Sequence, residues 1–262
     1  MNKTALVTGS SGGIGMELAR IHAENGGNLV LVARSKEKLD KLKEELEQKH
    51  NVLVCTIAKD LSVKNAAREV YDELMQKNIS VDYLINNAGL GDFGLFAESD
   101  WDKQENMINL NITALTHFTR LFLPDMIERR EGKILNVAST AAFQPGPTMS
   151  VYFATKAYVL SFSEAVNNEV KDKGITVTAL CPGSTESGFH AATVGDISLV
   201  KTRKLPSSRL VAEYGYRAMI KGKTVAIHGL LNTIMATSVR FFPRALIVKS
   251  VRKIQGGKHN MD

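Results

Sequence analysis

The sequence predicts a doubly wound α/β fold, a mostly parallel, seven-stranded sheet with helices on both faces. Short apolar runs alternate with segments of helical periodicity along the chain. Several of these runs, such as residues 29–32, are apolar at every position, which is typical of parallel strands buried on both faces. A glycine-rich turn joins the first apolar run to the first helical segment. We therefore expect a ligand crevice at the carboxyl ends of the strands.

The elements follow in order along the chain. Apolar runs predict strands near residues 4–7, 28–33, 52–57, 81–85, 132–138, 175–181 and 223–228. Helical periodicity predicts helices that include residues 14–23, 36–48, 66–77, 101–129 and 152–171.

Length and composition support one domain over residues 1–262. The chain is 44% apolar and 23% charged, which suits a sizeable core. No run of about 18 apolar residues occurs, so we expect no transmembrane helix, and the core strand beginning at Thr4 leaves no room for a signal peptide. Cys55 and Cys181 lie in separate apolar runs. We expect reduced thiols, a cytoplasmic location and no metal site.

The first turn, Thr8–Gly15, has the composition of a phosphate cradle. Gly9 would permit the tight turn, Gly13 would let the backbone approach a pyrophosphate, and Gly15 would allow the helix to pack closely on the strand. The N-terminus of the following helix offers free N–H groups to phosphates. The spacing Gly-x-x-x-Gly-x-Gly differs from the fingerprint Gly-x-Gly-x-x-Gly, and it is not a P-loop. Taken alone, the turn could equally be an ordinary tight turn.

Further motifs give the chain a family resemblance. They follow the glycine turn in this order: Asp60-Leu61, Asn86-Asn87-Ala88-Gly89, Asn111, Ser139, Tyr152-x-x-x-Lys156 and Pro182-Gly183. The order resembles that of the short-chain dehydrogenase/reductase superfamily over about residues 3–190. The resemblance implies a single Rossmann-like domain, a nicotinamide cofactor and a homodimer or homotetramer. The chain looks most similar to bacterial ketoacyl-reductase-like and hydroxysteroid-dehydrogenase-like members, a likeness that does not define a substrate.

Ser139, Tyr152 and Lys156 form a candidate catalytic set for reducing a carbonyl. The reaction needs a proton at oxygen, and Tyr152 can supply it if its pKa, about 10 when unperturbed, is lowered toward neutrality. Lys156 lies one helical turn later, where its charge would favour the phenolate and its ammonium could reach the nicotinamide ribose. Ser139 would orient the substrate oxygen. Taken singly, each could be an ordinary surface or loop residue.

The resemblance adds Asn111, whose backbone carbonyl would hold a water next to Lys156. Asn111 lies in an apolar helical stretch, where a polar side chain is costly unless it is hydrogen-bonded. Asn109, two residues earlier on a different helix face, competes for the role. Residues 111–114 fit the family register better, although Ala114 replaces the usual glycine.

The end of the second strand favours NADP(H) as the cofactor. An enzyme that prefers NAD would normally have an acidic residue where this chain has Ala33. Arg34 and Ser35 instead offer a guanidinium and a hydroxyl to a 2′-phosphate. Lys38 could add a second cation, or it could be a solvated residue at the start of the next helix.

Turns after the later strands supply the other predicted cofactor contacts. Asp60-Leu61 should face the adenine, Asn87–Gly89 should line its ribose and the pyrophosphate, and Pro182-Gly183 should cross the nicotinamide. Thr185 or Ser187 would bind the carboxamide or phosphates. The full predicted set is Gly9, Ser11, Gly13, Ile14, Gly15, Arg34, Ser35, Lys38, Asp60, Leu61, Asn87, Ala88, Gly89, Tyr152, Lys156, Pro182, Gly183 and Thr185.

Residues 184–208 lack a strong period and are predicted to form a substrate lid. Its apolar residues, and others opposite, would suit a nonpolar carbonyl compound, although apolar loop residues as often serve packing. They are Phe189, Val194, Ile197 and Leu199, with Phe143, Pro145 and Pro147 opposite.

Residues 230–258 form a basic extension. It carries six residues whose removal leaves 27 basic against 27 acidic residues, so it accounts for the net charge of +6. Apolar residues between them predict an amphipathic helix. We expect it to dock on its own fold or on a sister subunit, and contact with an anionic membrane surface or an acidic carrier is the alternative. No nucleic-acid recognition motif accompanies the charge. The basic residues are Arg240, Arg244, Lys249, Arg252, Lys253 and Lys258.

Together these features predict an NADP(H)-dependent oxidoreductase that mainly reduces a nonpolar ketone, aldehyde or 3-oxoacyl compound. A hydroxysteroid-type dehydrogenase is an alternative within the same chemistry. A noncatalytic NADP(H)-binding regulator is an alternative of another class, and the complete set of Asn111, Ser139, Tyr152 and Lys156 argues against it.

Overall fold

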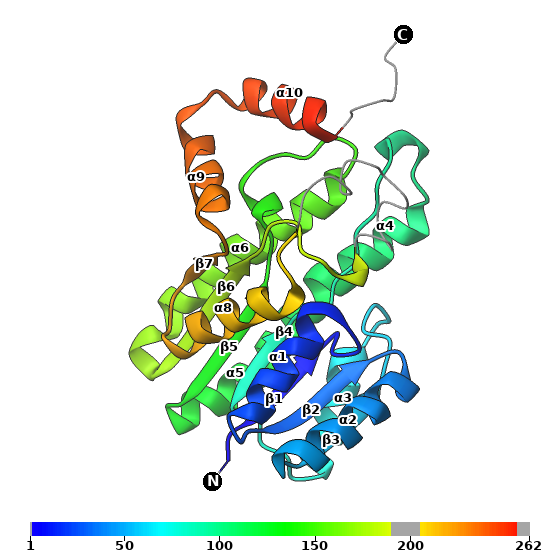
Figure 1. Cartoon of the computed structure of the whole chain (residues 1–262), viewed down its shortest axis with the longest axis vertical. Helices are drawn as coiled ribbons and strands as arrows, with labels where there is room; N and C mark the ends of the chain where they lie inside the picture. Colours follow the sequence, from blue (N-terminus) through cyan, green and yellow to red (C-terminus); the bar gives the residue numbers. More distant parts are fainter. Residues whose placement is uncertain (1, 190–204, 256–262) are drawn as a thin grey trace.

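A parallel sheet forms the centre of the molecule (Figure 1). The computed structural model describes residues 2–189 and 205–255, and within them seven strands pair in the order β3-β2-β1-β4-β5-β6-β7. The predicted fold class and all the predicted strands are confirmed. The strands are β1 (Thr4–Thr8), β2 (Asn28–Ala33), β3 (Val54–Ala58), β4 (Tyr83–Asn86), β5 (Gly132–Val137), β6 (Ile175–Cys181) and β7 (Val225–Ile227).

Helices cover both faces of the sheet. The first core contains α1, α2 and α8, and the second contains α3, α5 and part of α6. The bounds of these helices are α1 (Gly13–Glu24), α2 (Lys36–His50), α3 (Ala66–Gln76), α5 (Leu115–Arg129), α6 (Ser150–Val170) and α8 (Ser208–Ile220).

Strand β2 shows why the apolar runs are continuous. Leu29 and Leu31 belong to the first core, whereas Val30 and Val32 belong to the second. Successive side chains of a strand point to opposite faces, so a strand buried on both sides needs an apolar residue at every position.

The long helix predicted over 101–129 has three parts. Helix α4 (Trp101–Ile108) passes into a π-helical turn (Asn109–Ala114), and α5 continues from it. π-helical turns are often found at functional sites. This one contains Asn111, which is buried.

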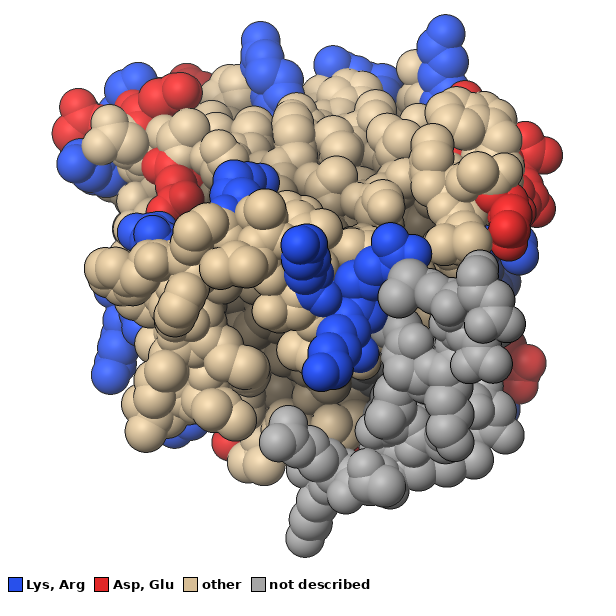
Figure 2. Space-filling view, turned by 90° about the horizontal axis from the view of Figure 1, so that it is seen from above, with Lys and Arg blue, Asp and Glu red and all other residues tan. Residues whose placement is uncertain are grey.

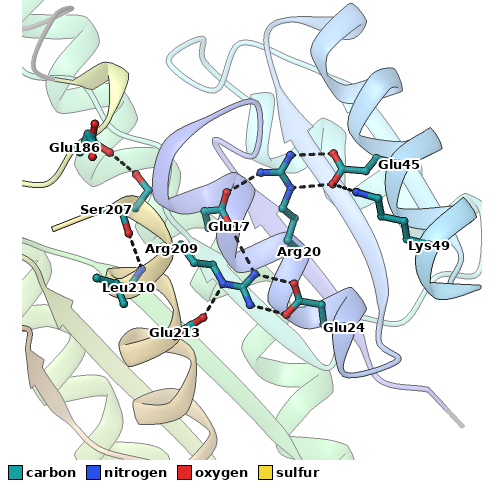
Figure 3. A network of polar contacts seen from close by, with 11 residues as sticks. Glu17, Arg20, Glu24, Glu45, Lys49, Glu186, Ser207, Arg209, Leu210 and Glu213 are labelled. Atoms are coloured by element: carbon teal, nitrogen blue, oxygen red, sulfur yellow. Dashed lines mark hydrogen bonds and ion pairs between the residues drawn. The ribbon is translucent and has the colours of Figure 1, made fainter.

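Ion pairs hold α8 against α1, and α1 against α2 (Figure 3). Arg209, in the first turn of α8, binds both carboxylate oxygens of Glu24, at 2.6 and 2.7 Å, and its Nε donates to Glu213 at 2.7 Å. Arg20 likewise binds both oxygens of Glu45. Just before α8, a parallel bridge joins Glu186 to Ser207. The network therefore fixes the position at which the chain returns from residues 187–206 to the core.

The C-terminal extension is helical, as predicted, and little of it is buried. It consists of α9 (Leu230–Ser238), a 3-10 turn (Val239–Phe241) and α10 (Arg244–Gln255), and in Figure 1 it projects beyond the sheet. None of the residues of α10, all of which the structure describes, is buried. The expected docking on its own fold is therefore not seen for α10, whereas Ala236 of α9 is buried, and docking on a sister subunit stays a prediction. Other short 3-10 helices are Phe96–Glu98, Thr140–Phe143 and Lys171–Lys173.

His22 should make stability depend on pH. The ring is buried, with Nδ1 at 2.9 Å from the Tyr216 hydroxyl and Nε2 at 3.0 Å from the Lys3 carbonyl oxygen. Burial disfavours the imidazolium and lowers the pKa of His22 below 6.5. The unfolded chain therefore binds a proton that the folded chain does not, and the free energy of unfolding should fall as the pH decreases below 6.5, by up to about 1.4 kcal/mol per unit.

Denaturant unfolding between pH 5 and 7 measures this effect. In His22→Gln, that part of the slope should disappear. His117→Gln is the matched control, because it replaces a half-buried histidine of α5. His228→Gln is not suitable, since burial also lowers the pKa of His228. A slope that is the same in His22→Gln and in the parent protein would contradict the assignment.

Candidate active site

A cavity of about 670 Å³ lies where the carboxyl ends of the strands meet. The turns after β1 to β6 all contribute to its wall. A crevice in this position is the usual ligand site of an open parallel sheet, and its volume is in the range of small-molecule and cofactor sites.

The glycine turn lies along one side of the cavity. Gly9, Ser11, Gly13 and Ile14 line it, as predicted for a phosphate cradle, and Gly9 and Gly13 have positive φ values of 67° and 56°. Gly15 does not line the cavity. A Cβ atom there would lie 2.3 Å from Asn87 Nδ2 and 2.4 Å from the Gly9 carbonyl oxygen, so this glycine permits close packing behind the cradle.

Thr8 and Asn87 join the ends of β1 and β4. The backbone N–H groups of Asn87 and Ala88 both donate to Thr8 Oγ1 at 3.0 Å. In return, Asn87 Nδ2 donates to the carbonyl oxygens of Thr8, at 3.0 Å, and of Gly9, at 3.2 Å. Asn87 thus positions the cradle, while its own turn, with Ala88 and Gly89, lines the cavity.

Cations gather at the end of the cavity next to β2 and β3. Arg34 and Lys38 are exposed on its wall beside Ser35, whose Oγ accepts from the Lys38 N–H at 3.4 Å and caps α2. Lys59, which sequence reasoning missed, also lines the cavity and pairs with Glu69. The pairing of β2 with β3 brings Ala33 opposite Ala58, so the residues after them become neighbours.

Asp60 and Leu61 line the cavity next to Lys59. The Asp60 carboxylate accepts hydrogen bonds from the Ser62 N–H at 2.9 Å and from its hydroxyl at 2.7 Å. Desolvation raises the pKa of Asp60, but these two bonds and the charge of Arg34 together outweigh it, so that the pKa is lowered. The carboxylate is therefore ionised and fixes the turn.

Ser139, Tyr152 and Lys156 lie on the wall at the other end of the cavity. Ser139 follows β5, accepts from the Ala141 N–H at 3.1 Å and donates to the Pro182 carbonyl oxygen at 3.5 Å. Tyr152 lies in the first turn of α6 and Lys156 in the next. Lys156 Nζ is 5.8 Å from the centre of the Tyr152 ring and donates to the Val137 carbonyl oxygen at 2.9 Å. The fold thus brings the predicted set together.

The pKa of Tyr152 differs from expectation. Burial raises it to about 12, because the hydrogen bond with Ser139 compensates only in part. Burial also lowers the pKa of Lys156 to about 8. At neutral pH, Tyr152 is therefore a neutral phenol that can donate a proton, and Lys156 is still mainly charged.

Asn111 lies behind this wall and does not line the cavity. Its Nδ2 donates to the Leu90 carbonyl oxygen at 2.9 Å and to Thr155 Oγ1 at 3.0 Å, and its Oδ1 accepts from the Leu90 N–H at 2.9 Å. These bonds favour Asn111 over the half-buried Asn109 as the residue that links α6 to the turn after β4. The role of its backbone carbonyl in holding a water stays a prediction.

The remaining predicted residues fall into two groups. Pro182, Gly183, Thr185 and Ser187 all line the cavity. Thr185 is the more deeply buried of the two hydroxyl residues, and its Oγ1 donates to the Gly183 carbonyl oxygen at 2.9 Å. Val194, Ile197 and Leu199 lie outside the described residues.

The apolar part of the wall is only in part the one expected from sequence. Phe189 lines the cavity, with its ring centre 5.5 Å from that of Tyr152. Phe143, Pro145 and Pro147, which were expected opposite Phe189, are not among the described residues that line the cavity. In and after this segment, the lining residues are Gln144, Met149 and Phe153, while Leu90 contributes from the turn after β4 and Gln255 from α10.

Comparisons with known proteins agree with this geometry. A family model described as short chain dehydrogenase matches residues 3–196. A very-long-chain 3-oxoacyl-CoA reductase from Rattus norvegicus is 32% identical over 260 residues, which cover 96% of this chain and 79% of that protein. The 17-beta-hydroxysteroid dehydrogenase type 3 of Mus musculus is 35% identical over 188 residues. The match covers 70% of this chain and 59% of the length of that protein.

Solved structures show the same similarity. A short-chain dehydrogenase from Sphingobium yanoikuyae in complex with NADPH has a TM-score of 0.80 and 30% identity, and the match covers 94% of this chain and 95% of that one. A bulky-bulky ketone specific alcohol dehydrogenase from Comamonas testosteroni has a TM-score of 0.78 and 29% identity. This match covers 94% of this chain and 93% of that one.

Substitution of Gly15 tests the packing behind the cradle. Gly15→Ala should lower the free energy of unfolding by about 1–3 kcal/mol, the usual cost of inserting a methyl group into a well-packed site. Gly12→Ala is the matched control, because Gly12 has an extended φ of 177° and nothing lies within 4 Å of the position of its Cβ. Denaturant unfolding without added cofactor gives both values. Equal losses in the two variants would show that Asn87 and Gly9 do not constrain position 15.

Proposed function

Because the chain belongs to the short-chain dehydrogenase family, we propose that it reduces a nonpolar carbonyl compound at the expense of NADPH, with Tyr152 as the proton donor. The enzyme is an NADP-dependent oxidoreductase. One observation supports the proposal above all: a single cavity has the glycine turn and a group of cations on one side and Ser139, Tyr152 and Lys156 on the other.

The residues of the cavity fit NADP(H). Gly9 and Gly13 expose backbone that side chains would otherwise cover, and α1 begins at the same turn, so its free N–H groups suit a pyrophosphate. Arg34, Lys38 and Lys59 suit a 2′-phosphate. Ala33 ends β2 without the carboxylate that would bind an unphosphorylated ribose.

The chain's own residues would position and protonate the substrate. Bound NADPH supplies the hydride. Tyr152 holds a proton on its hydroxyl at neutral pH and is within the wall that the carbonyl would face. Ser139 offers a hydroxyl to the same oxygen. The charge of Lys156 favours transfer of the proton, because it stabilises the phenolate that remains.

The lining favours a nonpolar substrate. Leu90, Met149, Phe153 and Phe189 form the apolar part of the wall near Tyr152. The relatives named as 3-oxoacyl-CoA reductases support a 3-oxoacyl compound as substrate. The relative named as a 17-beta-hydroxysteroid dehydrogenase supports the second candidate, a hydroxysteroid-type reaction.

Location and assembly are part of the proposal. The free thiols of Cys55, which is half-buried, and Cys181, which is buried, support a reducing and hence cytoplasmic setting. A homodimer or homotetramer is proposed from the family resemblance.

A panel of carbonyl compounds tests the reaction. The protein should oxidise NADPH with a 3-oxoacyl thioester or a bulky nonpolar ketone. Tyr152→Phe should lower turnover by about 10²-fold or more, since it removes a general acid, while NADPH binding persists. Tyr158→Phe is the matched control: it removes another hydroxyl from α6, one bonded to Thr116 and not lining the cavity. Turnover near the parent's in Tyr152→Phe would refute its role, and NADPH binding without turnover of any carbonyl compound would favour the noncatalytic regulator.

Arg34→Ala tests the cofactor preference. The variant should bind NADPH more weakly by about 1.5–3 kcal/mol, the scale of a hydrogen bond to a charged group, with little change for NADH. Lys36→Ala is the control, because Lys36 is exposed two residues away, pairs with Asp40 and does not line the cavity. Fluorescence titration with both cofactors decides the matter, and equal losses for NADH and NADPH would exclude Arg34 from specificity.

A further inference from the structure

The C-terminal extension presents a concentrated apolar surface to solvent. Leu230 is 78% exposed, Phe241 80% and Ile254 74%. Single exposed apolar residues are ordinary, but so many large ones within residues 230–254 indicate a surface that something else covers. We call it the α9–α10 surface, and its other large exposed apolar residues are Leu231, Ile234, Met235, Phe242 and Leu246.

The same surface is strongly basic. Residues 230–255 contain five basic residues and no acidic one: Arg240, Arg244, Lys249, Arg252 and Lys253. Within the described part of the chain, none of the five forms an ion pair. In Figure 2, which looks down on the end of the molecule shown at the top of Figure 1, basic side chains lie near the centre with no acidic side chain beside them, and both kinds lie around the edges.

Basic and apolar side chains share one face of α10. Leu246, Lys249 and Lys253 are spaced i, i+3 and i+7, so they lie on the same side, and all three are exposed. Such a mixture suits the boundary of a bilayer, where apolar side chains enter the acyl region and long basic ones reach the headgroups.

We propose that the α9–α10 surface binds an anionic membrane surface. A second copy of the chain fits less well, because a symmetric contact would bring five cations against the same five cations with no carboxylate among them. The elements lie on the membrane and do not cross it: a helix of 12 residues spans about 18 Å, less than the hydrocarbon core. Among residues 2–189 and 205–255, no helix has the length and hydropathy that a crossing needs.

The proposed membrane contact lies beside the mouth of the cavity. Gln255, at the end of α10, lines the cavity, and its Nε2 is 3.8 Å from the sulfur of Met149, another lining residue. A nonpolar substrate dissolved in the bilayer would therefore meet the enzyme next to its active site. This consequence rests on the proposed function, whereas membrane binding itself does not.

Vesicle flotation tests the binding. The full chain should float with vesicles of phosphatidylcholine and phosphatidylserine at low salt, and less at high salt, because surface charges are screened beyond about 8–10 Å at ordinary ionic strength. It should bind phosphatidylcholine alone weakly. Lys249→Ser/Arg252→Ser/Lys253→Ser should reduce the partition coefficient by about 10²-fold, since each basic residue near an anionic surface contributes about fivefold. Phe241→Ser/Phe242→Ser should reduce binding to both kinds of vesicle.

Matched control variants distinguish binding by the α9–α10 surface from effects of the protein's overall charge or of exposed apolar residues elsewhere. Lys103→Ser/Lys173→Ser/Lys221→Ser removes three exposed lysines from other elements, and Leu53→Ser/Val63→Ser removes two exposed apolar residues near β3. Both controls should bind vesicles as the parent does. NADPH binding, measured in every variant, should be unchanged, which reports an intact fold independently of the reaction. The proposal is overturned if the parent does not bind anionic vesicles, if the controls lose as much binding, or if the α9–α10 variants change only the oligomeric mass in sedimentation.

Discussion

The junction of β1 with β4 is the constraint on which the site depends. In the sheet these strands are neighbours, although some 75 residues separate them in the chain, and Thr8 and Asn87 connect their ends through four hydrogen bonds. The glycine turn leaves β1 at this point, and the turn of Asn87–Gly89 leaves β4. A Cβ atom on Gly89 would lie 3.5 Å from Lys156 Nζ, so the same junction extends to the catalytic wall. Cofactor cradle and proton donor are therefore held by one set of contacts.

Burial then decides which protonation states the site holds. Lys156 is 5% exposed, and taking its ammonium out of water disfavours the charged form, while the same loss of water disfavours the phenolate of Tyr152. Burial therefore disfavours both charged forms, the phenolate of Tyr152 and the ammonium of Lys156. A neutral phenol retains the proton that it has to donate, but the raised pKa makes Tyr152 a weaker acid, so the charge of Lys156 has to favour the transfer by stabilising the phenolate.

The sequence predicted those features that depend on local pattern. The strands could be recognised because β2 and its neighbours are apolar on both faces, and Arg34 could be recognised because it follows a strand end. Lys59 and Gln255 could not, since their place in the cavity depends on the pairing of β2 with β3 and on the path of α10. The rise in the pKa of Tyr152 comes from burial by residues distant in sequence. The amphipathic pattern of α10 predicted a helix correctly. It did not show what covers the apolar side chains, because packing on the same fold, self-association and membrane contact all favour the same mixture of residues.

The bridge between Glu186 and Ser207, followed at once by the Arg209–Glu24 pair, makes the stability of the fold depend little on the length of the chain between residues 186 and 207. Both ends of the intervening stretch are fastened to the core, so the core does not depend on how many residues lie between them. The free energy of closing a chain segment rises by only about 0.6 kcal/mol for each doubling of its length. Insertions and deletions between these two points are accordingly inexpensive for the fold, so the number of residues there can change during evolution while the sheet and its cavity are kept.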